Sequence, residues 1–147
     1  MRLSTALLVA AAVVSLVPAT VHAAREDQKG GAVPVPAGEI TCYVAGGSWS
    51  GTAADVQVNP GGGLRYVWPP SGLEVLTTEQ CIANIGADPI PAPPGRAVIE
   101  CASPVGSIVV AAIASEATIQ NGVTIWRDED SADAFLSTLA CRVRRLE

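Results

Sequence analysis

Two stretches of the sequence resemble each other, and they decide how the fold is predicted. The stretch ITCYVAGGS, Ile40–Ser48, has a near copy in IECASPVGS, Ile99–Ser107, with Ile, Cys, Gly and Ser at the same positions in both. In the first stretch, Ile40, Cys42 and Val44 alternate with Thr41, Tyr43 and Ala45. Such alternation before a glycine-containing turn is typical of a β-strand. Each stretch also holds a cysteine, whose role the rest of the chain decides.

The similarity between the two halves extends further. Each half continues with an Asn- and Gly-containing turn, a strand that ends in Trp68 or Trp126, and a segment close to a second cysteine, 39 or 40 residues after the first. One interpretation is an internal repeat of units 39–86 and 96–147. Units of about 50 residues are marginal alone, so they would share one core. The alternative is coincidence in a chain rich in Gly, Ala and Val.

The N-terminal segment has the features of a secretory signal peptide. Arg2 precedes an apolar run of twelve residues, 6–17, and a proline, and Val21 and Ala23 suit a peptidase that cleaves after residue 23. The alternative is a membrane anchor, but twelve residues span only about 18 Å as a helix. We therefore expect residues 1–23 to be removed and the protein to be secreted or periplasmic.

Cleavage would change the composition in two informative ways. The remaining 124 residues suffice for one domain, and they carry eight basic against fourteen acidic residues. An acidic chain without a 20-residue apolar run is not expected to bind nucleic acid or to span a membrane. Cleavage would also remove His22, the only histidine. Without it, Ser-His-Asp, Cys-His and His-containing zinc mechanisms are excluded, and no catalytic residue, metal or cofactor is predicted.

Most of the chain after the signal peptide is predicted as strands. Residues 24–38, with Gly-Gly and two prolines, are expected to form a flexible tail before a single domain, 39–147. A proline-rich connector, 87–95, divides this domain. The stretches with strand patterns are EITCYVA (39–45), DVQV (55–58), LRYVW (64–68), GLEVL (72–76), RAVIECAS (96–103), SIVVAAIAS (107–115) and ACRVRRLE (140–147).

Three further segments carry distinct local signals. ATIQNGVTIW, 117–126, predicts a two-residue type I′ hairpin around Asn-Gly, because both residues tolerate positive φ. The apolar run 107–115 lacks alternation, so a strand buried on both faces is expected. Two short helices are expected at 77–86, from a capping box and a terminal glycine, and at 128–139, from acidic residues at its start. The predicted class is therefore β-rich (α+β): a small, disulfide-stapled antiparallel sheet or sandwich.

The four cysteines are predicted to form two disulfides, because an exported protein meets an oxidising compartment. A four-thiolate metal site would show two close pairs, which the spacing lacks. The preferred pairs, one within each half, are Cys42–Cys81 and Cys101–Cys141. The nested alternative joins Cys42 to Cys141 and Cys81 to Cys101, and four cysteines allow a third pairing as well.

Two groups of carboxylates are candidate sites. Asp128, Glu129, Asp130 and Asp133 resemble a calcium loop but lack its glycine and distal glutamate, which favours acidic residues at a helix start. A carboxylate-based hydrolase would draw on Asp55, Glu74, Glu100 or Glu116, and no spacing selects a pair among them.

Aromatic residues beside flexible turns suggest a binding surface. Trp49 and Trp68 flank glycines and prolines, with Arg65 and Tyr66 as neighbours, and exposed aromatics on loops suit protein or glycan recognition. Alternatively, Trp68 and Trp126 are core anchors at equivalent strand ends. The sequence thus predicts a non-catalytic binding or inhibitor-type module for an extracytoplasmic protein or glycan. The alternatives are a small carboxylate-based hydrolase and a structural cell-envelope component.

Overall fold

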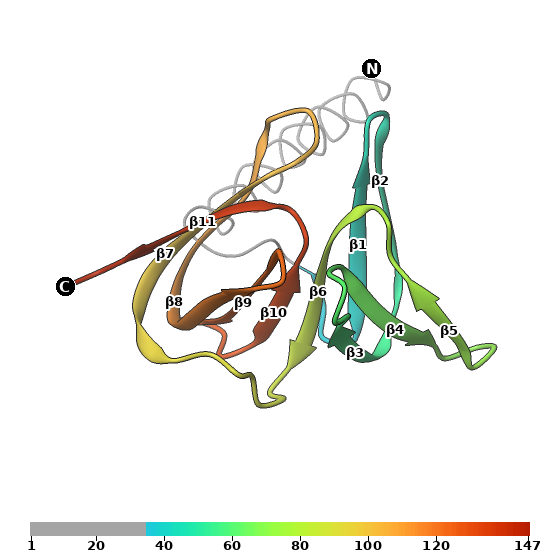
Figure 1. Ribbon diagram of the computed structural model, residues 1–147, viewed down its shortest axis with the longest axis horizontal. Helices are drawn as coiled ribbons and strands as arrows, with labels where there is room; N and C mark the ends of the chain where they lie inside the picture. Colours follow the sequence, from blue (N-terminus) through green and yellow to red (C-terminus); the bar gives the residue numbers. More distant parts are fainter. Residues whose placement is uncertain (1–34) are drawn as a thin grey trace, which may run out of the picture.

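The computed structural model describes residues 35–147, which form antiparallel β-strands and turns with no helix among them (Figure 1). The predicted signal peptide and residues 24–34 of the predicted tail lie outside the described residues. The strands are β1 (Glu39–Val44), β2 (Gly47–Thr52), β3 (Ala54–Val58), β4 (Leu64–Trp68), β5 (Leu73–Leu76), β6 (Gln80–Gly86), β7 (Pro94–Ala102), β8 (Ile108–Gln120), β9 (Val123–Asp128), β10 (Ala134–Ser137) and β11 (Ala140–Arg145). The β-rich class is therefore confirmed, without its helices.

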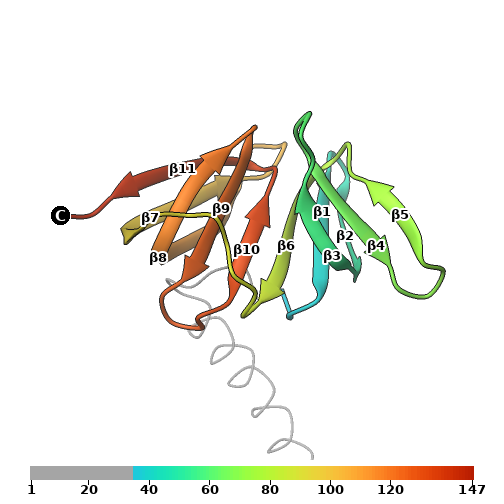
Figure 2. The same ribbon diagram turned by 60° about the horizontal axis from the view of Figure 1, so that its bottom comes forward.

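The strands form one large sheet and one small sheet. The large sheet has the order β11-β7-β8-β9-β10-β6-β1-β2, and the small one has the order β3-β4-β5. The small sheet lies beside β6, β1 and β2, so that β1–β6 form one half of the molecule and β7–β11 the other (Figures 1 and 2). The strand β10 pairs with β6 and joins the two halves.

The central strands of the large sheet are buried on both faces. On β9 and β10, Trp126 and Phe135 belong to one hydrophobic cluster, whereas Ile125 and Leu136 belong to a second. Side chains alternate between the faces of a strand, so the two clusters lie on opposite faces of the shared strands. One cluster is completed by β7, β8 and Ile82, and the other by β1 and the small sheet.

Both disulfides connect neighbouring antiparallel strands. Cys42 of β1 lies directly opposite Cys81 of β6, and Cys101 of β7 lies opposite Cys141 of β11. These are the two pairs that the sequence favoured, and the described residues contain no free cysteine. Each bond closes a loop of 39 or 40 residues, and loops of that length yield about 4 kcal/mol of stabilisation in the chain-entropy estimate.

The Asn-Gly hairpin between β8 and β9 is present as predicted. Asn121 has a φ of 50° and Gly122 a φ of 77°, and Gln120 pairs with Val123 across the turn. Positive φ at both central residues gives the turn a twist that matches the strands, which is why this dipeptide specifies a hairpin.

The helix predicted at 77–86 is wrong, because its residues form β6. The burial of Cys81, Ile82, Ala83 and Asn84 in succession shows that both faces of the segment are covered. A helix of this length would bury only one stripe, so tertiary packing and the bond from Cys81 to Cys42 override the capping signal.

The helix predicted at 128–139 is also wrong. The carboxylate of Asp128 accepts hydrogen bonds from the backbone N–H and the hydroxyl of Ser131, both at 2.9 Å. Ala132 has a φ of 62°, which a right-handed helix cannot contain. These residues form a tight turn, after which the chain continues as β10.

Two other expectations are wrong, and one strand was not expected. The strand β8 is not buried on both faces, since exposed residues such as Ile108 and Ile113 alternate with buried Val110 and Ala112. The strand β2 was not predicted, because GSWSGT has few strand-favouring residues. The end of the predicted tail is packed rather than free, because Val35 is buried in the core.

No helix within residues 35–147 is long and apolar enough to cross a membrane.

Candidate binding cleft

A cleft of about 340 Å³ opens between β2 and the small sheet. Its walls are the side chains of Trp49, Tyr66, Trp68 and Val75 together with residues 50–52 of β2. Three of the four residues predicted as a binding surface therefore meet in one place. They come from two strands that the chain brings together only through folding.

Trp49 is held in position by an acidic partner. It lies opposite Cys42 in the pairing of β1 with β2, so its side chain faces the same side of the sheet as the disulfide. Its indole Nε1–H donates a hydrogen bond of 2.9 Å to Oε2 of Glu79. Gly51 follows two residues later on the same face, and a Cβ there would lie 3.8 Å from the Trp49 ring. The indole thus extends along the strand over a position without a side chain.

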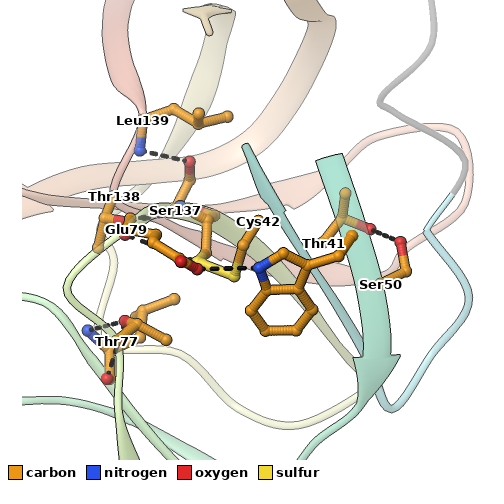
Figure 3. Close-up of a disulfide and its surroundings, with 11 residues drawn as sticks. Thr41, Cys42, Ser50, Thr77, Glu79, Ser137, Thr138 and Leu139 are labelled. Carbon is orange, nitrogen blue, oxygen red and sulfur yellow. Dashed lines mark hydrogen bonds between the residues drawn. A yellow bond between two sulfur atoms is a disulfide. The ribbon is translucent and has the colours of Figure 1, made fainter. Parts of the chain in front are cut away.

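Glu79 connects the cleft to the first disulfide. A carboxylate oxygen of Glu79 lies within 4.8 Å of the sulfurs of Cys42 and Cys81. Its backbone carbonyl accepts a hydrogen bond of 3.2 Å from the hydroxyl of Thr138, which in turn accepts one of 2.8 Å from the N–H of Cys81 (Figure 3). The segment before β6 is therefore fixed from both sides, and the carboxylate stays beside Trp49.

The two aromatic residues of β4 differ in exposure. Tyr66 is 6% exposed and Trp68 is 47% exposed, although both point to the inner face of the small sheet. Trp126, by contrast, is fully buried and stacks on Phe135 with ring centroids 5.2 Å apart. The alternative that both Trp68 and Trp126 are core anchors is thus wrong for Trp68.

The electrostatics of the cleft are acidic. Burial raises the pKa of the Tyr66 hydroxyl, and the negative charge of Glu79 raises it further. The carboxylate of Glu79 thus acts on the Tyr66 hydroxyl as well as on the Trp49 indole. Among residues 35–147, no arginine or lysine lines this cleft.

Arg65, the fourth predicted residue, lies on the opposite face of β4. Strand alternation directs it away from Tyr66 and Trp68, and it forms an ion pair with Glu74. Both line a separate shallow hollow of about 280 Å³ with Asp55 and Gln57. The sequence could not show this division, because it depends on which face of β4 packs on the core.

The structure brings two of the four hydrolase candidates together. Asp55 and Glu74 line the same hollow, whereas Glu100 lines another and Glu116 approaches Arg127 at 3.8 Å. Glycoside hydrolysis requires one carboxyl group that stays protonated near neutral pH. In this hollow the carboxylate of Glu74 is engaged in an ion pair with Arg65.

Among residues 35–147, the acidic segment 128–133 does not bring three carboxylates together at metal-ligand spacing. The carboxylate of Asp128 is used within the turn by Ser131, and Glu129 pairs with Arg96 at 2.7 Å. Within residues 35–147, one group of three side chains has metal-ligand spacing: Cys42, Glu79 and Cys81. Its two sulfurs are bonded to each other, so they are not available as thiolate ligands.

Sequence reasoning missed Gly51, Val75 and Glu79 as parts of the cleft. None of them had a usable signal in the sequence; Glu79, for example, is brought beside Trp49 by the pairings of β1 with β2 and with β6. No family model matches the chain, and no curated protein or solved structure matches it either.

Proposed function

We propose that the protein is a non-catalytic binding module that acts outside the cytoplasm and takes part of a protein or glycan into the cleft between β2 and the small sheet. The observation that carries the proposal is the convergence of Trp49, Tyr66 and Trp68 on one open cleft. Tryptophan and tyrosine are enriched among the residues that dominate the energetics of recognition.

The chemistry of the cleft supports recognition rather than catalysis. Its side chains are two indoles, one phenol and Val75, with a carboxylate at its edge. Aromatic faces stack on sugar rings, on apolar side chains and on cations. Two disulfides are typical of an oxidising extracytoplasmic environment, and one of them, Cys42–Cys81, lies in the half of the molecule that carries the cleft.

An internal repeat is part of this proposal, and the strand pairings support it. The strand β1 pairs with β2 and β6, and β7 pairs with β8 and β11, each with a disulfide on the second pairing. In the same way, β4 pairs with β3 and β5, and β9 pairs with β8 and β10. The two halves differ in the burial of the equivalent tryptophans. In the second half Trp126 is fully buried, so this half is called closed, whereas in the first half Trp68 is exposed, so this half is called open. We infer that the first half carries the binding function.

A cleft-filling variant tests the proposal. In Gly51→Leu, the new side chain points into the cleft, and the position has neither positive φ nor a contact shorter than 3.8 Å. Gly46→Leu is the matched control, because a Cβ there meets nothing within 4 Å and Gly46 lies outside the cleft. Purified, oxidised protein is screened against glycan and peptide arrays. We expect Gly51→Leu to weaken any binding at least tenfold and Gly46→Leu to leave it unchanged. Equal binding by both variants, or no binding by the parent, would contradict the proposal.

A further inference from the structure

Four strands end the two sheets of the described chain, β2 and β11 in the large sheet and β3 and β5 in the small one, and the free edges of β5 and β11 match each other. The strand β5 has β4 on one side only, and β11 has β7 on one side only. They lie at opposite ends of the molecule in both views (Figures 1 and 2). A free edge offers unpaired N–H and C=O groups to a further strand.

The molecule contains an internal precedent for joining these two edges. Trp126 of β9 lies opposite Phe135 of β10, and Trp68 of β4 lies opposite Leu73 of β5. The outer edge of β10 is occupied by β6, whose Ile82 packs in the same cluster as Trp126 and Phe135. The corresponding edge of β5 is free, and Trp68 and Leu73 are 47% and 61% exposed. By disulfide position, the strand that corresponds to β6 is β11.

The hydrogen-bonding groups of the two edges are compatible. The N–H of Thr77 donates a hydrogen bond to the carbonyl of Leu64. Because backbone groups alternate along an antiparallel ladder, the backbone N–H and C=O of Glu74 and Leu76 point away from β4. The N–H of Leu146 bonds to the carbonyl of Arg96, which likewise directs Cys141 and Val143 away from β7.

The precedent also fixes a register. In the β6–β10 pairing, the N–H of Thr138 bonds to the carbonyl of Cys81. The same register applied to β5 and β11 pairs Leu76 with Cys141 and Glu74 with Val143. Both are pairs whose N–H and C=O groups point outward, so the two edges can form a regular antiparallel ladder.

Side-chain charge favours this pairing between copies. In the same register, Arg142 and Arg144 lie opposite Val75 and Leu73, on the face that carries Trp68 and the cleft. Both arginines are exposed in the single chain. Their guanidinium groups can stack on the indole of Trp68 and reach the carboxylate of Glu79. These cation–π and charged contacts would take the place that the apolar side chain of Ile82 has beside Trp126 in the other half.

We propose that copies of this chain associate head to tail, with β11 of one copy added to the edge of β5 of the next and its arginines over the aromatic cleft. The inference rests on the proposed function, because it names a second copy as the protein that the cleft binds. The interface is heterologous, so repetition produces a chain of molecules rather than a closed dimer. The competing explanation is that the arginines keep a free edge from pairing at all.

Two complementary variants test the proposal. Leu76→Pro removes the outward N–H of β5 without removing a bond to β4, and Leu76→Thr is its control, which keeps that N–H. Arg144→Glu reverses the charge on β11, and Ile119→Glu is its control, because it adds a negative charge to an exposed position on β8. Thermal unfolding of each purified, oxidised variant checks that it folds.

The measurement is the mass distribution in analytical ultracentrifugation over a hundredfold range of protein concentration. We expect the parent and both controls to form larger species that shrink at high salt, and Leu76→Pro and Arg144→Glu to remain monomers. An equimolar mixture of the two variants should form a dimer and nothing larger, since each keeps one intact edge. A monomeric parent, or variants that associate as the parent does, would overturn the inference. Continued binding of an array ligand in that case would leave the proposed function intact.

Discussion

At the scale of single residues, Glu79 has the largest effect on the cleft. Its carboxylate accepts the hydrogen bond of Trp49 and raises the pKa of Tyr66, while its backbone is held by Thr138. One exposed side chain thus orients the indole on one wall and acts on the phenol of the other. Removing its charge without changing its shape should be visible in the ionisation of Tyr66.

The first prediction is that Glu79→Gln lowers the pKa of Tyr66. Tyr43 serves as the internal reference, because its pKa is raised by burial alone. In an ultraviolet titration, both tyrosines of the folded parent should ionise above the usual value of about 10, and the variant should lower one of them. The control Glu74→Gln should change neither. Unchanged titration of Glu79→Gln would show that Glu79 does not face Tyr66.

The same ionisations give a pH dependence of stability. The folded-state pKa values of Tyr43 and Tyr66 are raised, whereas an unfolded tyrosine ionises near pH 10. The contribution of the neutral tyrosines is therefore fully present below about pH 10 and is lost as the pH rises through the folded-state values.

The residues of the cleft were only partly predictable from the sequence. Trp49 and Trp68 stood out because they flank glycines and prolines, and Tyr66 came with them as a neighbour. Arg65 was grouped with them by adjacency, but neighbours along a strand point to opposite faces. Val75 lies on β5, and Glu79 directly precedes β6. Only the pairing of β4 with β5 and of β1 with β6 brings these two residues to the cleft.

At the level of the strands, one disulfide joins two interior strands of the large sheet, and the other joins an interior strand to an edge strand. Cys42–Cys81 joins β1 and β6, both of which have neighbours on each side. Cys101–Cys141 joins β7 to the edge strand β11. Equal loop lengths predict equal effects on global stability, but the local consequences of losing each bond should differ.

The second prediction compares the double variants Cys42→Ser/Cys81→Ser and Cys101→Ser/Cys141→Ser. Each should lose about 4 kcal/mol of unfolding free energy, because each opens a loop of roughly 40 residues. In hydrogen exchange at low denaturant, the second variant alone should lose protection in β11 while β1 and β6 keep theirs. Loss of protection throughout the molecule in the second variant would show that β11 is not an independent edge.

The elements that were mispredicted share one cause. The segments 77–86 and 128–139 carry local signals for helix starts, and each instead supplies a strand to the buried centre of the large sheet. Their successive buried residues show that each strand is covered on both faces. From the local sequence alone, such a buried strand cannot be distinguished from a buried helix. The Asn-Gly hairpin was predictable because its conformation depends on two adjacent residues alone.

At the scale of the whole molecule, the two halves resemble each other in pairing and differ in closure. The sequence revealed the paired cysteines and the similarity of the halves, but not that β10 joins β6 and thereby covers Trp126. The corresponding cover is absent from Trp68 in the described chain. Closure depends on contacts between segments about 50 residues apart, which no local pattern encodes.

The claim that the open half of the molecule binds β11 of a second copy is checked by the three indole N–H signals in a ¹⁵N–¹H spectrum. The spectrum is recorded as the concentration of the oxidised protein rises, with Arg144→Glu as the control. We expect the signals of Trp49 and Trp68 to shift with concentration, the signal of Trp126 to stay constant, and all three to stay constant in Arg144→Glu. Three constant signals in the parent, or a shift of Trp126, would contradict it.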